Sequence, residues 1–178
     1  MIDPDVLERI VAFHGHMCPG LAMGVQAAQI ALREIGPHST DEEVVAVTET
    51  DMCGVDAIQF LTGCTFGKGN LLHKDFGKNA YTFFRRSDGK AIRVAGRPDA
   101  WERITGDGPL ERSRSLLETP PDELFTVEAV DGEPPTLARV FSSVECASCG
   151  EPTMETRVRL LDGRGLCAPC FEQALPGR

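Results

Sequence analysis

The sequence feature that most restricts the fold is a pair of Cys-x2-Cys motifs near the C-terminus. They are formed by Cys146, Cys149, Cys167 and Cys170. Two sulfurs separated by two residues can bind one tetrahedral ion, and two such pairs at this spacing are typical of a structural zinc site with four thiolate ligands. Four thiolates fill the coordination sphere, so we expect this zinc to stabilise the fold rather than to catalyse a reaction.

The residues around these cysteines predict a small zinc finger over 145–178. The segment Arg157–Leu161 with the turn Asp162-Gly163 suggests a hairpin, and Pro169 begins a predicted helix. This order is typical of a treble-clef finger or a zinc ribbon. A segment this short cannot build a sufficient core, so zinc would supply most of its folding energy. The alternative is that the four cysteines are free or disulfide-bonded.

Residues 1–144 carry the pattern of an α+β domain. We predict helices near 4–13, 21–35, 55–62 and 109–117, and strands near 44–48, 80–85, 90–95, 124–130 and 137–144. Helices and strands do not alternate strictly, which favours a mixed or antiparallel sheet packed against helices over a doubly wound parallel sheet.

The other three cysteines lie at predicted ends of secondary structure. Pro19 fits the first position of a helix and would place Cys18 at the N-cap, where free backbone N–H groups and the helix dipole favour a thiolate. Cys53 similarly lies between a strand and a helix, and Cys64 follows the end of that helix.

These cysteines, together with two nearby histidines, predict a metal or redox site in the core domain. The candidate ligands are His14, His16, Cys18, Cys53 and Cys64. Sulfur and imidazole ligands suit zinc or another transition metal better than magnesium. The sequence leaves open which histidine points inward. The alternative is that the cysteines are small buried apolar residues and the histidines ordinary loop residues.

Several charged residues flank the predicted core site. Glu49, Asp51 and Asp56 are candidates for hydrogen bonds to metal-bound histidines. Lys68, which lies between two glycines, is a candidate contact for an anionic ligand or cofactor. Its segment is not a phosphate-binding P-loop, because Gly69 occupies the position of the magnesium-binding Ser or Thr.

Charge and hydropathy restrict the partners. With 18 basic and 27 acidic residues, the formal net charge is −9, which argues against sequence-independent nucleic-acid binding. The longest stretch without charged residues is too often interrupted for a membrane span, and the N-terminus lacks the pattern of a secretory signal. We therefore expect a cytoplasmic protein with neither a nucleic-acid nor a membrane partner, and with its thiols reduced.

Three segments together resemble the family of the formylmethanofuran dehydrogenase E-subunit. They are residues 14–20, 51–59 and 62–70, in the family's order. The resemblance implies an α+β core, a homodimer and a site around the His-x-Cys loop. It assigns His16, Cys18, Cys53 and Cys64 as the principal site residues, with His14 beside them. Some family members carry a C-terminal treble-clef finger, which the four C-terminal cysteines match.

Two hypotheses about function follow. In the first, the protein is a metal-binding accessory subunit of a molybdenum- or tungsten-dependent oxidoreductase similar to formylmethanofuran dehydrogenase, an enzyme of one-carbon metabolism. The core metal would be functional and the finger would be a docking module. In the second, the protein is itself an enzyme, with a low-pKa thiolate at Cys18 or Cys53 as nucleophile and His16 as base.

Overall fold

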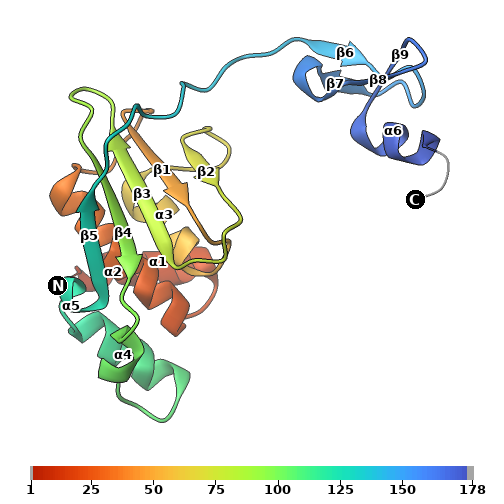
Figure 1. Ribbon diagram of the computed structural model, residues 1–178. Helices are drawn as coiled ribbons and strands as arrows, with labels where there is room; N and C mark the ends of the chain where they lie inside the picture. Colours follow the sequence, from red (N-terminus) through yellow and green to blue (C-terminus); the bar gives the residue numbers. More distant parts are fainter. Residues whose placement is uncertain (1, 176–178) are drawn as a thin grey trace. The chain divides into compact units, whose positions relative to one another are not determined.

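The computed structural model describes residues 2–175 and divides the chain into two compact units (Figure 1). The first unit ends at Ala138 and the second begins at Arg139. Each unit is described by itself. Within residues 2–175, no helix is long and apolar enough to cross a membrane.

The first unit is an α+β domain, which confirms the predicted fold class. Its helices are α1 (Pro4–His14), α2 (Pro19–Glu34), α3 (Gly54–Thr62), α4 (Pro109–Glu118) and α5 (Pro121–Leu124), with a 3-10 turn η1 at Ala100–Arg103. Its strands are β1 (Val44–Thr48), β2 (Leu71–His73), β3 (Ala80–Arg85), β4 (Ala91–Gly96) and β5 (Phe125–Ala129).

The five strands form one mixed sheet in the order β2-β1-β3-β4-β5. Strand β2 pairs in parallel with β1, and the other neighbours are antiparallel. Side chains alternate between the two faces of a strand, so Ala46 and Phe83 join the main core with the helices, while Val45 and Phe84 join a smaller cluster. The sheet is therefore buried over both faces of β1.

Helices α2 and α3 are in backbone contact, and this contact positions the candidate core site. A Cβ atom at Gly24 in α2 would overlap the backbone of Gly54, the first residue of α3. Glycine permits this close approach because it has no side chain. The contact brings the beginnings of the two helices together, and with them the N-cap residues Cys18 and Cys53.

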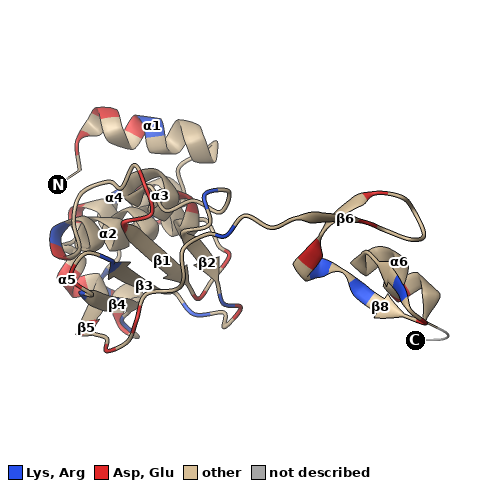
Figure 2. Cartoon of the chain, turned by 90° about the horizontal axis from the view of Figure 1, so that it is seen from above, with Lys and Arg blue, Asp and Glu red and all other residues tan. Residues whose placement is uncertain are grey.

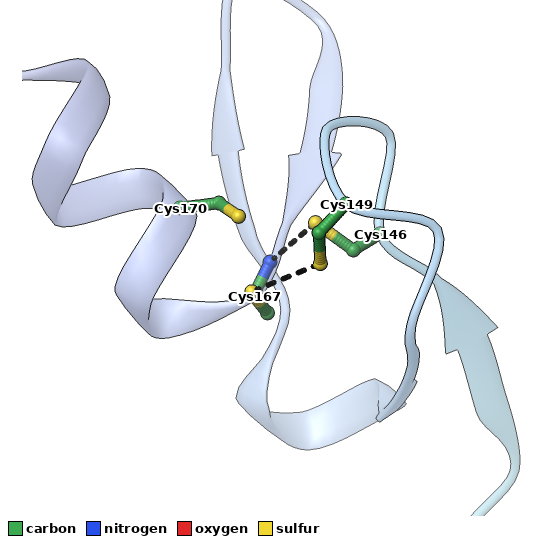
Figure 3. Close-up of side chains that lie close together, drawn as sticks. All are labelled: Cys146, Cys149, Cys167 and Cys170. Carbon is green, nitrogen blue, oxygen red and sulfur yellow. Dashed lines mark hydrogen bonds between the residues drawn. The ribbon is translucent and has the colours of Figure 1, made fainter.

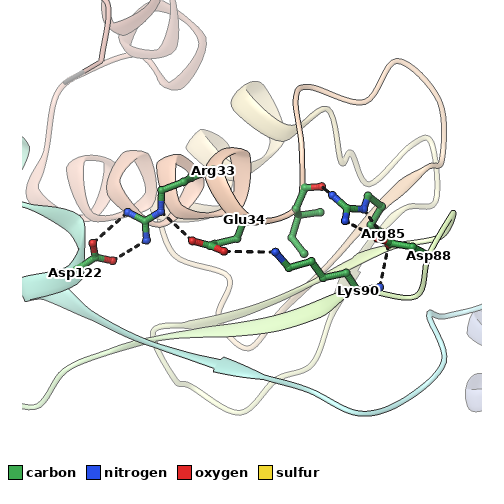
Figure 4. A network of polar contacts seen from close by, with 7 residues as sticks. Arg33, Glu34, Arg85, Asp88, Lys90 and Asp122 are labelled. Atoms are coloured by element: carbon green, nitrogen blue, oxygen red, sulfur yellow. Dashed lines mark hydrogen bonds and ion pairs between the residues drawn. The ribbon is translucent and has the colours of Figure 1, made fainter.

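A polar network fixes the C-terminal end of α2 to its neighbours (Figure 4). Arg33 donates two hydrogen bonds to the carboxylate of Asp122 in α5, 3.1 and 2.7 Å long, and holds the pKa of that carboxyl below its usual range. Glu34 accepts a hydrogen bond from Lys90 beside β4. These groups are exposed, so each pair contributes only about 0–1 kcal/mol. Their main effect is to orient the helix.

Two predictions about the core domain were wrong or incomplete. The strand predicted over 137–144 does not join the core sheet, because Leu137 and Val140 are exposed and residues 137–142 are irregular. There, the backbone N–H of Ala138 donates to Glu42. The last residues of the predicted strand belong to a hairpin of the second unit. The short strand β2 was not predicted, because only one of its three residues is buried.

The second unit contains two small hairpins and one helix. The hairpins pair β6 (Ser143–Glu145) with β7 (Pro152–Met154) and β8 (Arg159–Leu161) with β9 (Arg164–Leu166), and α6 spans Ala168–Ala174. The predicted turn is present, and Asp162 and Gly163 both adopt positive φ, at 49° and 74°. This conformation matches the twist of a tight hairpin. Because β6 pairs within this unit, the unit includes residues before 145.

The contact between α2 and α3 makes a stability prediction. Gly24→Ala should lower the free energy of unfolding by at least about 1–3 kcal/mol, because the new methyl group has to displace helix backbone. Gly67→Ala is the matched control, since a Cβ there meets open space, and we expect a change within about 0.5 kcal/mol. Urea denaturation of both variants measures the difference, and equal stabilities would contradict the close contact.

Candidate metal centres

The four C-terminal cysteines converge on one point of the second unit (Figure 3). Their sulfurs all lie within 4.8 Å of one another, and those of Cys149 and Cys167 are 3.9 Å apart. Zinc–sulfur bonds of about 2.3 Å in a tetrahedron place sulfurs about 3.8 Å apart. The observed spacing therefore fits a zinc site with four cysteine ligands.

Backbone groups prepare one of these thiols for metal binding. The N–H groups of Cys149 and Cys167 face the Cys146 sulfur and lower its pKa to about 6. The hydrogen bond from the Cys167 N–H is 3.3 Å long. A thiol must lose its proton to bind zinc, so these contacts favour the ligand form near neutral pH.

A second group forms where α1 ends and α2 begins. The ligand atoms of His14, His16 and Cys18 lie within 4.8 Å of one another. Helix α1 ends at Gly15, whose φ of 100° reverses the chain direction. Cys18 is the N-cap of α2, as predicted, and its sulfur accepts a hydrogen bond of 3.3 Å from the N–H of Leu21.

His14 is the histidine best placed to be a ligand. Its Nδ1 lies 2.6 Å from Oδ2 of Asp56, and its Nε2 lies 3.9 Å from the Cys18 sulfur. If Nδ1 donates its proton to the carboxylate, the lone pair on Nε2 faces Cys18. This carboxylate–histidine arrangement is the one that orients metal-binding imidazoles in many proteins. The His14 side chain is only 10 % exposed, whereas His16 is exposed.

Cys53 lies beside Cys18 at the beginning of α3. A Cβ atom built on Gly20 would be 3.8 Å from the Cys53 sulfur and 3.9 Å from the Cys18 sulfur, so the two thiols flank this glycine. Burial raises the pKa of the Cys53 thiol, and the adjacent Cys18 raises it further. Without a cation, Cys53 is therefore not poised as a thiolate.

The structure does not bring every candidate into this group. Cys64 is fully buried in the core, where its thiol donates a 3.3 Å hydrogen bond to the carbonyl of Val44, so its position is that of a small core residue. The Lys68 ammonium donates to the carbonyl of Ser39 at 3.0 Å.

The acidic residues that flank the group also differ in position. Glu49 forms hydrogen bonds of 2.7 and 2.9 Å with Arg93, and this guanidinium lowers the pKa of Glu49. Asp51 is exposed. Of the three acidic candidates, Asp56 is the one that contacts a histidine of the group.

Comparison with protein families places this geometry. The profile of the FmdE family, described as "FmdE, Molybdenum formylmethanofuran dehydrogenase operon", matches residues 13–126. The chain belongs to the FmdE family. A second profile, the prokaryotic dksA/traR C4-type zinc finger, matches residues 139–174. This FmdE protein therefore carries a C-terminal zinc finger, as predicted, and the four-cysteine cluster lies within it.

Two known proteins are similar to this FmdE protein. A probable S-adenosyl-L-methionine-binding protein of Archaeoglobus fulgidus is 33 % identical over 93 % of the chain, and the chain spans about half (52 %) of that relative's length. The crystal structure of an FmdE-like protein of the tungsten formylmethanofuran dehydrogenase type, from Syntrophus aciditrophicus, has a TM-score of 0.72 and 24 % identity. That match covers 98 % of this chain and 94 % of the other.

The zinc finger makes a prediction about metal removal. A strong chelator should unfold residues 139–175 and leave residues 2–138 folded, because the second unit has a buried cluster of only Cys146, Leu166 and Cys167 among its described residues. Two-dimensional NMR of the full chain shows both units at once. Cys149→Ser should give the same spectrum as chelation, and a finger that stays folded without zinc would contradict the prediction.

Proposed function

We propose that this FmdE protein is a metal-binding accessory protein of a molybdenum- or tungsten-dependent oxidoreductase similar to formylmethanofuran dehydrogenase. The observation that carries the proposal is the group formed by His14, Cys18 and Cys53, with His16 beside it. Membership of the FmdE family supplies the class of partner.

The donors of the core group suit a transition metal. His14 would bind through Nε2, with Asp56 holding the other ring nitrogen, and Cys18 and Cys53 would supply two sulfurs. A cation would stabilise the thiolate of Cys53, whose pKa is otherwise raised by burial. This nitrogen–sulfur set is soft enough for zinc or a related divalent metal. Exposed His16, or a ligand from outside, would complete the coordination.

The zinc finger would then be the docking module of the protein. Within residues 139–175, four arginines and no lysine occur with five acidic residues, and Figure 2 shows the two kinds of charge interspersed. A mixed surface of this kind favours a protein partner over phosphate groups. We also propose that the chain is a homodimer, a property to be tested by its mass in solution.

One observation favours a second candidate function. Cys18, His14 and Asp56 are arranged in the order of a thiol, base and carboxylate triad. In this alternative Cys18 is a nucleophile, His14 rather than His16 is its base, and Asp56 orients the base. The presence of Cys53 beside Cys18 favours the metal, because a triad does not need a second thiol.

Metal analysis of the purified protein distinguishes the two functions. We expect two metals per chain, with Cys18→Ser losing the core metal and keeping the zinc of the finger. Cys64→Ser is the matched control and should keep both, because Cys64 is bonded to Val44 in the core. One zinc per chain, with rapid alkylation of Cys18 near neutral pH, would contradict metal binding and support the nucleophile.

The histidines make a finer prediction within the metal hypothesis. His14→Ala should lower the affinity for the core metal more than His16→Ala, because His14 is buried and held by Asp56. Asp56→Asn should weaken binding about 10–100-fold by disturbing the orientation of the ring. Competition with a chromogenic chelator measures these affinities. A larger effect of His16→Ala would reverse the assignment.

A further inference from the structure

A separate cavity lies directly behind the thiols of the core group. Its volume is about 320 Å³, enough for about ten water molecules. Gly20 and Gly54 form part of its wall, and these are the residues that lie against or follow the two cysteines. A molecule in this cavity would be separated from Cys18 and Cys53 only by glycine backbone.

A buried hydroxyl group faces this cavity without a partner. Tyr81, in β3, is 1 % exposed and lines the cavity. Within residues 2–175, no side chain or backbone group forms a hydrogen bond with its hydroxyl, and burial alone raises the pKa of Tyr81 above its ordinary value. The group therefore keeps its proton. A buried hydroxyl without a partner costs free energy, which a bound acceptor would recover.

The rest of the lining describes the chemistry of a ligand. Met23, Met52 and Trp101 supply apolar and polarisable surface, and Thr50 and Asn79 are the other polar side chains. Among the described residues, no charged side chain lines the cavity. A charged ligand would lose its hydration here without compensation, whereas a flat uncharged molecule with a carbonyl group would match both the apolar wall and the hydroxyl.

We propose that this cavity binds a small uncharged organic molecule, or the uncharged part of a larger one, through a hydrogen bond from Tyr81 to a carbonyl oxygen. Its role as the ligand site of the neighbouring metal centre rests on the proposed function. The binding itself does not, because neither Cys18 nor His14 lines the cavity.

The test uses benzamide as the probe and benzoate as its charged counterpart of the same shape. Trp101 is the only tryptophan of the chain and lines the cavity, so its fluorescence reports on occupancy. We expect benzamide to change this fluorescence saturably and benzoate to bind more weakly. Absence of benzamide binding, by fluorescence and by ligand-observed NMR, would overturn the proposal.

Tyr81→Phe identifies the hydroxyl's contribution. It should weaken benzamide binding about 5-fold, the effect of one neutral hydrogen bond, without lowering the urea midpoint, because the hydroxyl makes no bond within residues 2–175. Phe66→Ala, at an exposed residue outside the lining, is the matched control and should bind as the wild type does. Equal affinity of Tyr81→Phe and wild type would overturn the assignment of the site.

Failure of this proposal can be distinguished from failure of the proposed function. Cys18→Ser should lose the core metal but still bind benzamide, because its side chain is outside the cavity. Loss of benzamide binding in Cys18→Ser would contradict a cavity formed by the fold alone.

Discussion

The candidate core site depends on the backbone contact between α2 and α3. Gly24 lies against Gly54, and no residue with a side chain would fit at the first of these positions without moving a helix. The contact sets the separation of the two helix N-termini, and the N-cap residues follow from it. It also leaves Gly54 next to the Tyr81 hydroxyl, where a Cβ atom would lie only 2.5 Å away. One close approach thus positions both the thiols and a wall of the cavity behind them.

The two cysteine groups of the chain are formed in opposite ways. In the core domain, the sheet and helices bury a large apolar cluster, and His14, Cys18 and Cys53 are positioned by elements that fold without a metal. In the finger, the buried cluster consists of the cysteines and one leucine, so the ligands are themselves the core. A metal in the first group would be available for function, whereas the zinc of the finger is needed for structure.

The sequence was most informative where local chemistry decides the structure. Asp3-Pro4 begins a helix, Cys18 before Pro19 is an N-cap, and the Cys-x2-Cys spacing matches a zinc finger. It was least informative where contacts distant in the sequence decide. The carboxylate that holds His14 comes from Asp56, 42 positions further along the chain. The position of Cys64 likewise depends on the carbonyl of Val44, in a different strand.

The most direct test of a metal site in the core domain is anomalous diffraction from a crystal of the metal-loaded full chain. Our account predicts two peaks per chain, one among the four finger cysteines. The other should be bonded to Nε2 of His14 and to the sulfurs of Cys18 and Cys53, at about 2.0–2.1 and 2.3 Å if the metal is zinc. A single peak in the finger, with the Cys18 and Cys53 thiols free, would contradict it.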